Sequence, residues 1–322
     1  GRPLPAATRL EPFAADPRLE LESRTARHEV SRFEIDSVGQ NRQPADRVTG
    51  RYYRAAGSVP RPLVVVLPIW GASAYPQRTT TRHLLGHPIA SSFHLLTIDG
   101  ERYLFDWRAM RQADDPESFL SELRRSVAAF ATTVTDVRRL LRWARARPEV
   151  DSSRVAIVGF SIGAILGIDV MAPEPRLAAG GFVMGGGRLH EILATCPRRP
   201  ARARRNMIEL TGWSPEEYEA RIEPILAPVD PVHYAPAIDP SRVLFVDAGA
   251  DRCIPSSGRE ALWSALGHPE RLTVPLNHRA AFLSMTPLFG HRTTRHLIEF
   301  VAARLEAQPT SRPLTVAGGG VP

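Results

Sequence analysis

The sequence predicts an α/β protein whose central sheet is mostly parallel and covered by helices on both faces. Two observations carry this prediction. Six short segments are almost continuously apolar, which is typical of strands buried on both sides by helices. Long segments between them place apolar residues at intervals of three and four, as amphipathic helices do. The chain has 322 residues, 43% of them hydrophobic, which is enough for one large core.

The first two predicted strands differ from the later ones. The segments His28–Ile35 and Val48–Tyr53 alternate apolar and polar residues, so we expect half-exposed antiparallel strands there. The six buried strands follow further along the chain: Leu63–Leu67, Phe93–Ile98, Val155–Val158, Gly181–Met184, Val243–Val246 and Leu272–Val274.

The clearest predicted helix covers Ser118–Arg147, where apolar residues such as Phe119 and Leu123 recur at helical spacing until Pro148 stops it. A last helix is expected over about His291–Leu305 and closes the domain.

The chain divides into one domain with two polar ends. Residues 1–25 are polar and rich in proline, and we expect a surface arm; residues 307–322 contain three consecutive glycines and are expected to be a disordered tail. The domain then spans 26–306. Because the chain begins with Gly1, we expect that a leader or tag was removed, and both an exported and a cytoplasmic location stay open.

The segment 187–237 interrupts the alternation of strands and helices. It has no strand-like run, only amphipathic pieces such as Glu216–Leu226, and its size predicts a helical cap or lid. Trp213 and Tyr218 would give this cap apolar surface for a substrate. The segment also contains a basic cluster, which we interpret as a solvated helix face rather than a rim for anionic substrates: Arg198, Arg199, Arg202, Arg204 and Arg205.

Composition excludes several classes of protein. All 41 basic residues are arginine, and the formal net charge is +7, but no nucleic-acid-binding motif accompanies this charge. No apolar run is long enough to span a membrane. Cys196 and Cys253 lack metal-binding spacing, and we expect two unpaired thiols, with a single disulfide as the alternative. His83 and His87 are four residues apart, but Gly86 breaks the helix there, so we predict no metal and no cofactor.

A Gly-x-Ser-x-Gly pattern over Gly159–Gly163 is the strongest functional signal. It follows a buried strand directly and opens an apolar helix, which is the context of a nucleophile elbow. The glycines leave room for a sharp turn, and Ser161 at its apex is the predicted nucleophile. Because the helix begins here, the amide of Ile162 can point at a developing oxyanion.

A serine nucleophile needs a base, and the base needs a carboxylate that fixes its tautomer. Asp251 follows the strand Val243–Val246, and His278 follows the strand Leu272–Val274, so the chain order is serine, acid, histidine. Asp247 is the rival acid, but it stands at the very end of its strand, and we prefer Asp251.

The second oxyanion donor is expected in the loop after Leu63–Leu67, which runs from Pro68 to Ala72. We choose the amide of Trp70, with Ile69 next. Ile69 within this loop and Phe160 next to the nucleophile are further candidates for the substrate pocket.

On these motifs, residues from about 48 to 305 resemble the α/β-hydrolase superfamily, in particular its serine carboxylesterase and dienelactone-hydrolase-like branch. The resemblance implies an eight-stranded, mostly parallel sheet flanked by helices and a serine triad that needs no cofactor. One departure is that Pro68-Ile69-Trp70-Gly71 stands where many relatives have His-Gly.

The sequence therefore predicts a serine hydrolase that cleaves small carboxylic esters through an acyl-enzyme intermediate. A thioesterase or peptidase with the same triad is the alternative among enzymes, and a hydrolase-fold binding protein without activity is the alternative outside them. Acyl length and oligomeric state are not predicted.

Overall fold

The computed structural model describes residues 17–37, 47–70, 75–86, 93–100 and 104–307. Much of the expected arm (1–16), the tail from residue 308, and Gly71, Ala72 and His87 lie outside these residues. Among the described helices, none is long and apolar enough to cross a membrane.

One twisted sheet of nine strands forms the centre of the molecule, in the order β1-β2-β3-β5-β4-β6-β7-β8-β9. Its last six members by sequence are mutually parallel, and β1, β2 and β3 form an antiparallel extension at one edge. The strands are β1 (Arg18–Arg24), β2 (His28–Asp36), β3 (Arg47–Ala55), β4 (Arg61–Leu67), β5 (His94–Ile98), β6 (Val150–Phe160), β7 (Leu177–Val183), β8 (Val243–Ala248) and β9 (Glu270–Val274).

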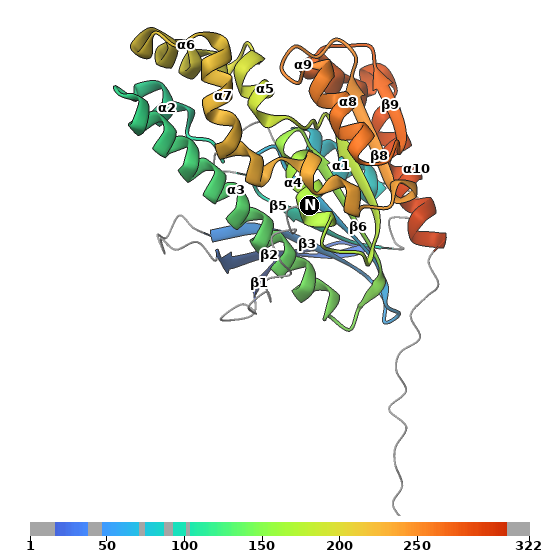
Figure 1. Ribbon diagram of the computed structural model, residues 1–322. Coiled ribbons are helices and arrows are strands. Elements are labelled where there is room, and N and C mark those ends of the chain that lie inside the picture. Colours follow the sequence, from blue (N-terminus) through green and yellow to red (C-terminus); the bar gives the residue numbers. More distant parts are fainter. Residues whose placement is uncertain (1–16, 38–46, 71–74, 87–92, 101–103, 308–322) are drawn as a thin grey trace, which may run out of the picture.

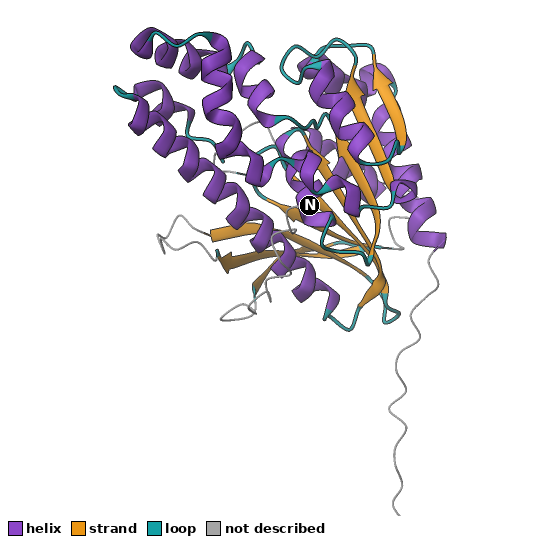
Figure 2. Ribbon diagram, in the orientation of Figure 1, coloured by secondary structure: helices purple, strands orange, loops and turns teal. Residues whose placement is uncertain are grey.

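Helices cover both faces of this sheet (Figures 1 and 2). They are α1 (Tyr75–Gly86), α2 (Trp107–Gln112), α3 (Pro116–Arg145), α4 (Ile162–Met171), α5 (Leu189–Thr195), α6 (Arg199–Thr211), α7 (Pro215–Leu226), α8 (Ser256–Ala265), α9 (His278–Ala281) and α10 (Arg292–Ala307). One core cluster joins the sheet to α3, α4 and α8, and a second joins its other face to α1 and α10. The predicted α/β class and the eight predicted strands are confirmed.

The ninth strand is a difference from the expected eight. β1 lies within the segment expected to be an arm, and it pairs antiparallel with β2 from Arg18 to Arg24. Leu19 and Leu21 alternate with charged residues as in a strand, but all seven side chains of β1 are exposed. The strand is therefore held by main-chain pairing and buries no apolar face of its own.

The segment 187–237 folds into α5, α6 and α7, followed by short 3₁₀ turns. These helices pack on one another and on α2 and α3, and they form a helical layer at one end of the molecule (Figure 1). Asn206 ties α6 to α2 through a hydrogen bond of 2.9 Å to the carbonyl of Ala113. The chain enters this layer from β7 and leaves it toward β8.

Candidate active site

Ser161 stands at the junction of β6 and α4, near the middle of the sheet. Its backbone has φ 52° and ψ −117°, a conformation that residues other than glycine rarely adopt. The turn is held by a hydrogen bond of 2.8 Å from the Ser161 amide to the carbonyl of Val183 on β7. The serine side chain is therefore lifted clear of the strand, and the residue is partly exposed.

The two glycines of the motif are required by close contacts. A Cβ atom on Gly159 would lie 2.1 Å from the carbonyl oxygen of Gly163, and one on Gly163 would lie 2.2 Å from the carbonyl oxygen of Pro68. Since both contacts are with main-chain atoms, no side-chain rotation relieves them. The turn thus depends on glycine at both positions, as the sequence pattern predicts.

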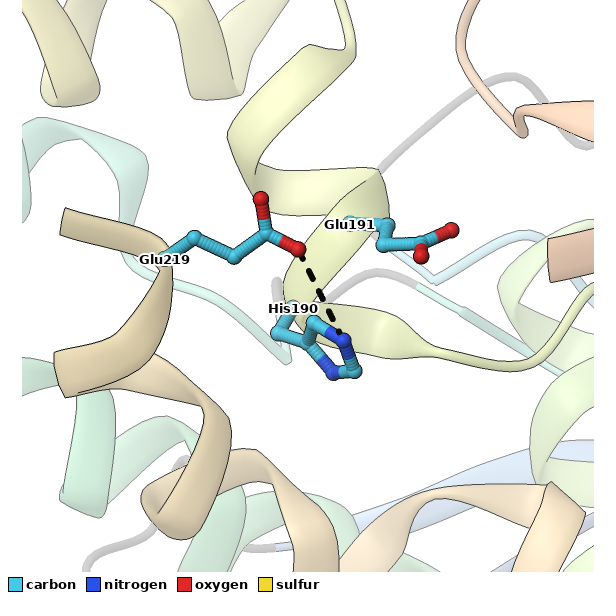
Figure 3. A group of neighbouring side chains, drawn as sticks. All are labelled: His190, Glu191 and Glu219. Atoms are coloured by element: carbon cyan, nitrogen blue, oxygen red, sulfur yellow. Dashed lines mark ion pairs between the residues drawn. The ribbon is translucent and has the colours of Figure 1, made fainter. Parts of the chain in front are cut away.

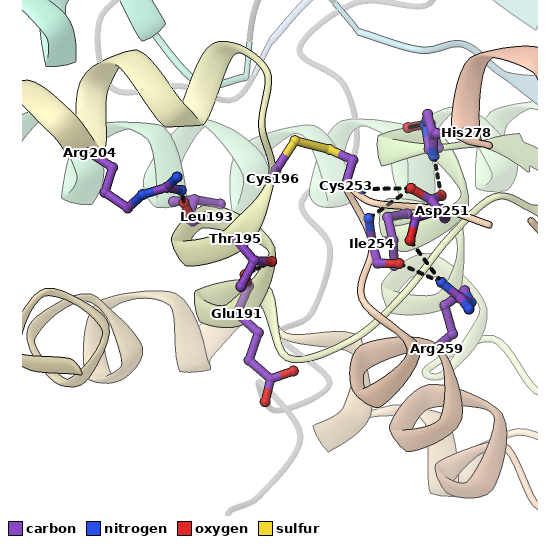
Figure 4. Close-up of a disulfide and its surroundings, with 11 residues drawn as sticks. Glu191, Leu193, Thr195, Cys196, Arg204, Asp251, Cys253, Ile254, Arg259 and His278 are labelled. Atoms are coloured by element: carbon purple, nitrogen blue, oxygen red, sulfur yellow. Dashed lines mark hydrogen bonds and ion pairs between the residues drawn. A yellow bond between two sulfur atoms is a disulfide. The ribbon is translucent and has the colours of Figure 1, made fainter. Parts of the chain in front are cut away.

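A hydrogen-bonded series joins Ser161 to His278 and Asp251, three residues far apart in the sequence. Ser161 Oγ lies 3.1 Å from His278 Nε2. Figure 4 shows the next contact, in which His278 Nδ1 lies 2.6 Å from Asp251 Oδ2. His278 begins α9, which Asn277 caps by accepting from the amides of Arg279 and Ala280. The structure thus brings the predicted nucleophile, base and acid together in the order that acyl transfer requires.

The carboxyl group of Asp251 is buried and fully engaged. Its Oδ1 accepts hydrogen bonds of 2.7 Å and 3.0 Å from the amides of Cys253 and Ile254. Burial alone would raise the pKa of Asp251, but the hydrogen bond with His278 and the two amides outweigh it, and the pKa is lowered. Asp251 is therefore held as a carboxylate facing the imidazole.

Asp247, the rival acid, has different partners. Its Oδ2 lies 3.2 Å from Arg259 Nε and 2.7 Å from Arg271 Nη2, and its side chain is 1% exposed. It is thus part of a buried ion-pair group beneath the loop that carries Asp251.

Arg259 on α8 was not singled out from the sequence, yet it holds the loop of the acid. Its guanidinium donates to the carbonyl of Ile254 at 2.6 Å, and weakly to that of Asp251 at 3.5 Å (Figure 4). Nothing in the sequence around Arg259 separates it from the many solvated arginines; only its burial, at 6% exposure, does so.

The predicted oxyanion donors lie on the two segments that meet at the nucleophile. Ile162 is the first residue of α4, so its amide has no acceptor within the helix. Trp70 is buried, and Ile69 is half-buried, in the loop after β4 whose Pro68 carbonyl abuts Gly163. The role of both amides stays a prediction.

Two of the four predicted pocket residues do not reach solvent, which corrects that expectation. Phe160 and Tyr218 are 0% and 1% exposed. Phe160, at the end of the central strand β6, belongs to the core cluster that joins the sheet to α1 and α10, and the Tyr218 ring packs 5.9 Å from that of Phe119 on α3. Trp213 and Ile69 are partly exposed, and both stay candidates.

The two cysteines form a disulfide, which corrects the expectation of unpaired thiols. Cys196 ends α5 in the cap segment, and Cys253 lies two residues after Asp251 (Figure 4). The sequence separation of 57 hides the pairing, because only the fold brings the end of α5 beside the loop of the acid.

One group of metal-binding residue types occurs among the described residues: His190, Glu191 and Glu219, whose ligand atoms lie within 4.8 Å of one another (Figure 3). His190 Nε2 pairs with Glu219 at 3.7 Å. Glu191 is already engaged by Arg188 and by the hydroxyl of Ser257. We assign no metal to this cluster.

Comparison with known proteins identifies the fold. No family model and no curated protein matches the chain. An acetyl xylan esterase from Paenibacillus is similar in structure, with a TM-score of 0.60, 18% identity and 91% of each chain covered. An acetyl xylan esterase from Thermoanaerobacterium gives 0.58, 16% identity and 89% of each chain. The acylaminoacyl peptidase of Pyrococcus horikoshii gives 0.58 and 15% identity, over 89% of this chain and 43% of that one.

These similarities, with the parallel sheet and the elbow after β6, show that the protein has the α/β-hydrolase fold.

Proposed function

We propose that this protein is a serine hydrolase that cleaves small carboxylic esters through an acyl-enzyme intermediate on Ser161. The observation that carries the proposal is the hydrogen-bonded series from Ser161 through His278 to Asp251 at a partly exposed, strained turn. Esters are the first substrate class to test, because two of the structurally similar proteins are named acetyl xylan esterases.

The chemistry follows from the order of the three side chains. His278 Nε2 takes the proton of Ser161 Oγ as the oxygen attacks the ester carbonyl carbon. The tetrahedral intermediate collapses, and the imidazolium returns the proton to the leaving alcohol. Water, deprotonated by His278, then attacks the acyl-enzyme and releases the carboxylic acid. Asp251 keeps the Nδ1 proton facing itself and stabilises the imidazolium in each half-reaction.

The amides of Ile162 and Trp70 are the proposed donors to the oxyanion. Ile162 is at the N-terminus of α4, where the helix dipole favours negative charge. The contact between Pro68 and Gly163 holds the Trp70 loop beside that helix start. Two main-chain donors fixed by packing would need no reorganisation when charge develops.

Replacing the nucleophile tests the proposal directly. Ser161→Ala should lower kcat/KM for p-nitrophenyl acetate by at least about 10³-fold, since it removes the attacking atom. The melting temperature should stay within a few degrees. Ser121→Ala, at a half-buried position on α3, is the matched control and should keep full activity. A Ser161→Ala rate within tenfold of wild type would refute the assignment.

A fluorophosphonate probe separates an enzyme from a binding protein without activity. Only a serine activated by a base reacts rapidly with such a probe. Wild type should be labelled at Ser161, and His278→Ala should not. Unlabelled wild-type protein with an intact fold would favour the binding protein.

We also propose that the segment 187–237 acts as a cap that shapes substrate choice. Its chain leaves β7 at the carboxyl edge of the sheet, which is where ligands bind in open α/β folds, and it reaches the amino end of β8 only after α5, α6 and α7. Its disulfide to the loop of Asp251 keeps the end of α5 close to the acid.

Trp213 is the residue with which to test the cap. It lies between α6 and α7, partly exposed, with the guanidinium of Arg221 4.4 Å from its ring. Trp213→Ala should change the preferred acyl length in a series of p-nitrophenyl esters, because each methylene is worth about 1 kcal/mol in an apolar pocket. Leu21→Ala, which removes an exposed apolar side chain on β1, is the control. An equal change for every acyl length would contradict the cap role.

A further inference from the structure

A cavity whose lining does not include Ser161, Asp251 or His278 lies along α1, on the face of the sheet opposite to α3 and α4. Its volume is about 560 Å³. Its floor comes from the outward side chains of β3 and the end of β5, and one wall is α1. The residues that the argument uses are Arg51, Tyr53, Ile69, Arg78, Thr81 and Arg82.

Two arginines on this wall have no carboxylate partner among the described residues. Arg78 and Arg82 are one helical turn apart on α1, so their side chains leave the helix on the same face. The third arginine, Arg51, is held by Glu22 at 2.8 Å and lies 4.0 Å from Asp99, which also lines the cavity. Glu22 and Asp99 thus pair with Arg51, and no described carboxylate pairs with Arg78 or Arg82, which are both exposed residues at the cavity.

A buried hydroxyl group on the same wall also lacks a partner. Thr81 lies between these two arginines on α1, is 7% exposed and lines the cavity. Its Oγ1 has no hydrogen-bond partner in the described part of the chain. A buried polar atom without a partner is costly. This oxygen is closed to solvent, so a ligand in the cavity would accept its hydrogen bond after the Thr81 side chain rotates toward the cavity.

Much of the remaining wall is apolar, although Gln77, Thr97 and Asp99 also line the cavity. The ring of Tyr53 and the side chains of Pro68, Ile69 and Leu85 face the same space. A bare inorganic anion would leave these walls in contact with water. The combination fits a planar anion that accepts two guanidinium contacts and carries an apolar body, which is the chemistry of a small organic carboxylate.

We propose that this cavity binds a small aromatic or short-chain carboxylate. The carboxylate lies between Arg78 and Arg82 and accepts from the Thr81 hydroxyl, and the apolar body packs on Ile69 and Tyr53. The site does not require Ser161 to be reactive. Pro68 and Ile69 belong to the loop that also reaches the nucleophile's turn, so the cavity and the proposed active site share this loop, but binding does not depend on the proposed hydrolysis.

Benzoate binding to the Ser161→Ala protein, measured by calorimetry, tests the site apart from catalysis. Arg78→Ala/Arg82→Ala in that background should weaken benzoate binding at least tenfold. The matched control is Arg108→Ala/Arg111→Ala on α2, which removes the same charge from exposed positions and should leave binding unchanged. Circular dichroism would verify that each variant is folded.

Two further comparisons make the outcome specific. Thr81→Val should weaken binding and Thr81→Ser should restore it, whereas benzyl alcohol and inorganic phosphate should bind at least tenfold more weakly than benzoate. Equal losses of benzoate affinity in the Arg78/Arg82 and Arg108/Arg111 double variants would overturn the proposal, as would an affinity that neither double variant changes. The proposal would also fail if benzoate did not bind at all, or if phosphate bound as tightly as benzoate.

Discussion

Asp247 and Asp251 are four residues apart, and their surroundings give them different partners. Asp251 faces the imidazole of His278 and accepts two main-chain amides, whereas Asp247 faces the guanidinium groups of Arg259 and Arg271. The two carboxylates are linked through Arg259, which contacts the side chain of Asp247 and the carbonyl groups beside Asp251. Asp251 therefore contacts the histidine, and Asp247 stabilises the loop through Arg259.

Substituting each of these acids separates the two tasks. Asp251→Asn should lower kcat/KM by about 10³- to 10⁴-fold, because the amide favours the wrong histidine tautomer. Asp247→Asn should lower the free energy of unfolding by about 3 kcal/mol, since it leaves buried guanidinium charge unpaired, and should alter kcat/KM far less. Rates measured on fully folded protein and urea unfolding curves are the readouts. The reverse ranking of the two rates would move the acid to Asp247.

A third aspartate, Asp169 on α4, is buried without a role in the proposed chemistry. Its Oδ1 has no partner among the described residues, and it lies near Asp230, whose side chain accepts from the amides of Arg188 and Leu189 at the start of α5. Burial, together with the neighbouring Asp230, raises the pKa of Asp169 well above its ordinary value of 3.8. The carboxyl group is thus favoured in its neutral form in the folded protein.

This raised pKa predicts the sign of a pH effect on stability. The folded state holds a proton that the unfolded chain releases, so the contribution is fully present below the unfolded pKa and is lost as pH rises through the folded pKa. Asp169→Asn cannot ionise, and its stability relative to wild type should therefore grow from pH 4 to pH 8. Urea unfolding at three pH values checks this, with exposed Asp114→Asn as control. Parallel curves for wild type and Asp169→Asn would contradict it.

At the scale of elements, the disulfide joins the cap segment to the loop of the acid. Cys196 ends α5, and the amide of Cys253 donates to Asp251 Oδ1, so the bond fixes a residue that in turn orients the carboxylate. The same loop is held from its other side by Arg259. Two independent restraints therefore act on the position of the acid.

Removing the disulfide should affect both stability and catalysis. Cys196→Ser/Cys253→Ser should lower the free energy of unfolding by about 4 kcal/mol, because the bond closes a loop of 57 residues. It should also lower kcat more than it raises KM, since the acid is displaced and not the substrate surface. Wild type reduced with dithiothreitol should behave alike. Unchanged unfolding curves, with reduction verified by thiol titration, would show that the bond restrains nothing.

The elements that the sequence predicted are those with strong local signals. The strand Val155–Val158 is a continuous run of apolar residues, which marks it as buried. The glycines two residues on either side of Ser161 meet a steric requirement of the turn, so both signals lie within a few adjacent residues. β1 could not be predicted with the same security, because all its side chains are exposed and its pairing partner is β2. Main-chain hydrogen bonds hold β1 in the sheet, and these leave no signal in the pattern of side chains.

Across the whole molecule, the order of the candidate catalytic residues could be predicted, but not their supports. Ser161, Asp251 and His278 each follow a recognisable strand, and parallel strands bring their following loops to one edge. Arg259 lies on α8 and Cys196 lies in the cap segment, and neither follows a strand whose end would predict its place near the site. Tyr218 shows the same limit, since amphipathic spacing predicts a buried face and does not tell whether a helix or a substrate covers it.

The bond between Cys196 and Cys253 also makes a closed ring of covalent structure, which contains α6, α7 and β8. Cutting one peptide bond anywhere within the ring opens it but releases no fragment. A protease site placed at the exposed turn of Gly212, between α6 and α7, would therefore yield a nicked protein that runs as one piece without reductant and as two pieces with it. The cap segment could be given a free end in this way while its base stays attached to the loop of Asp251.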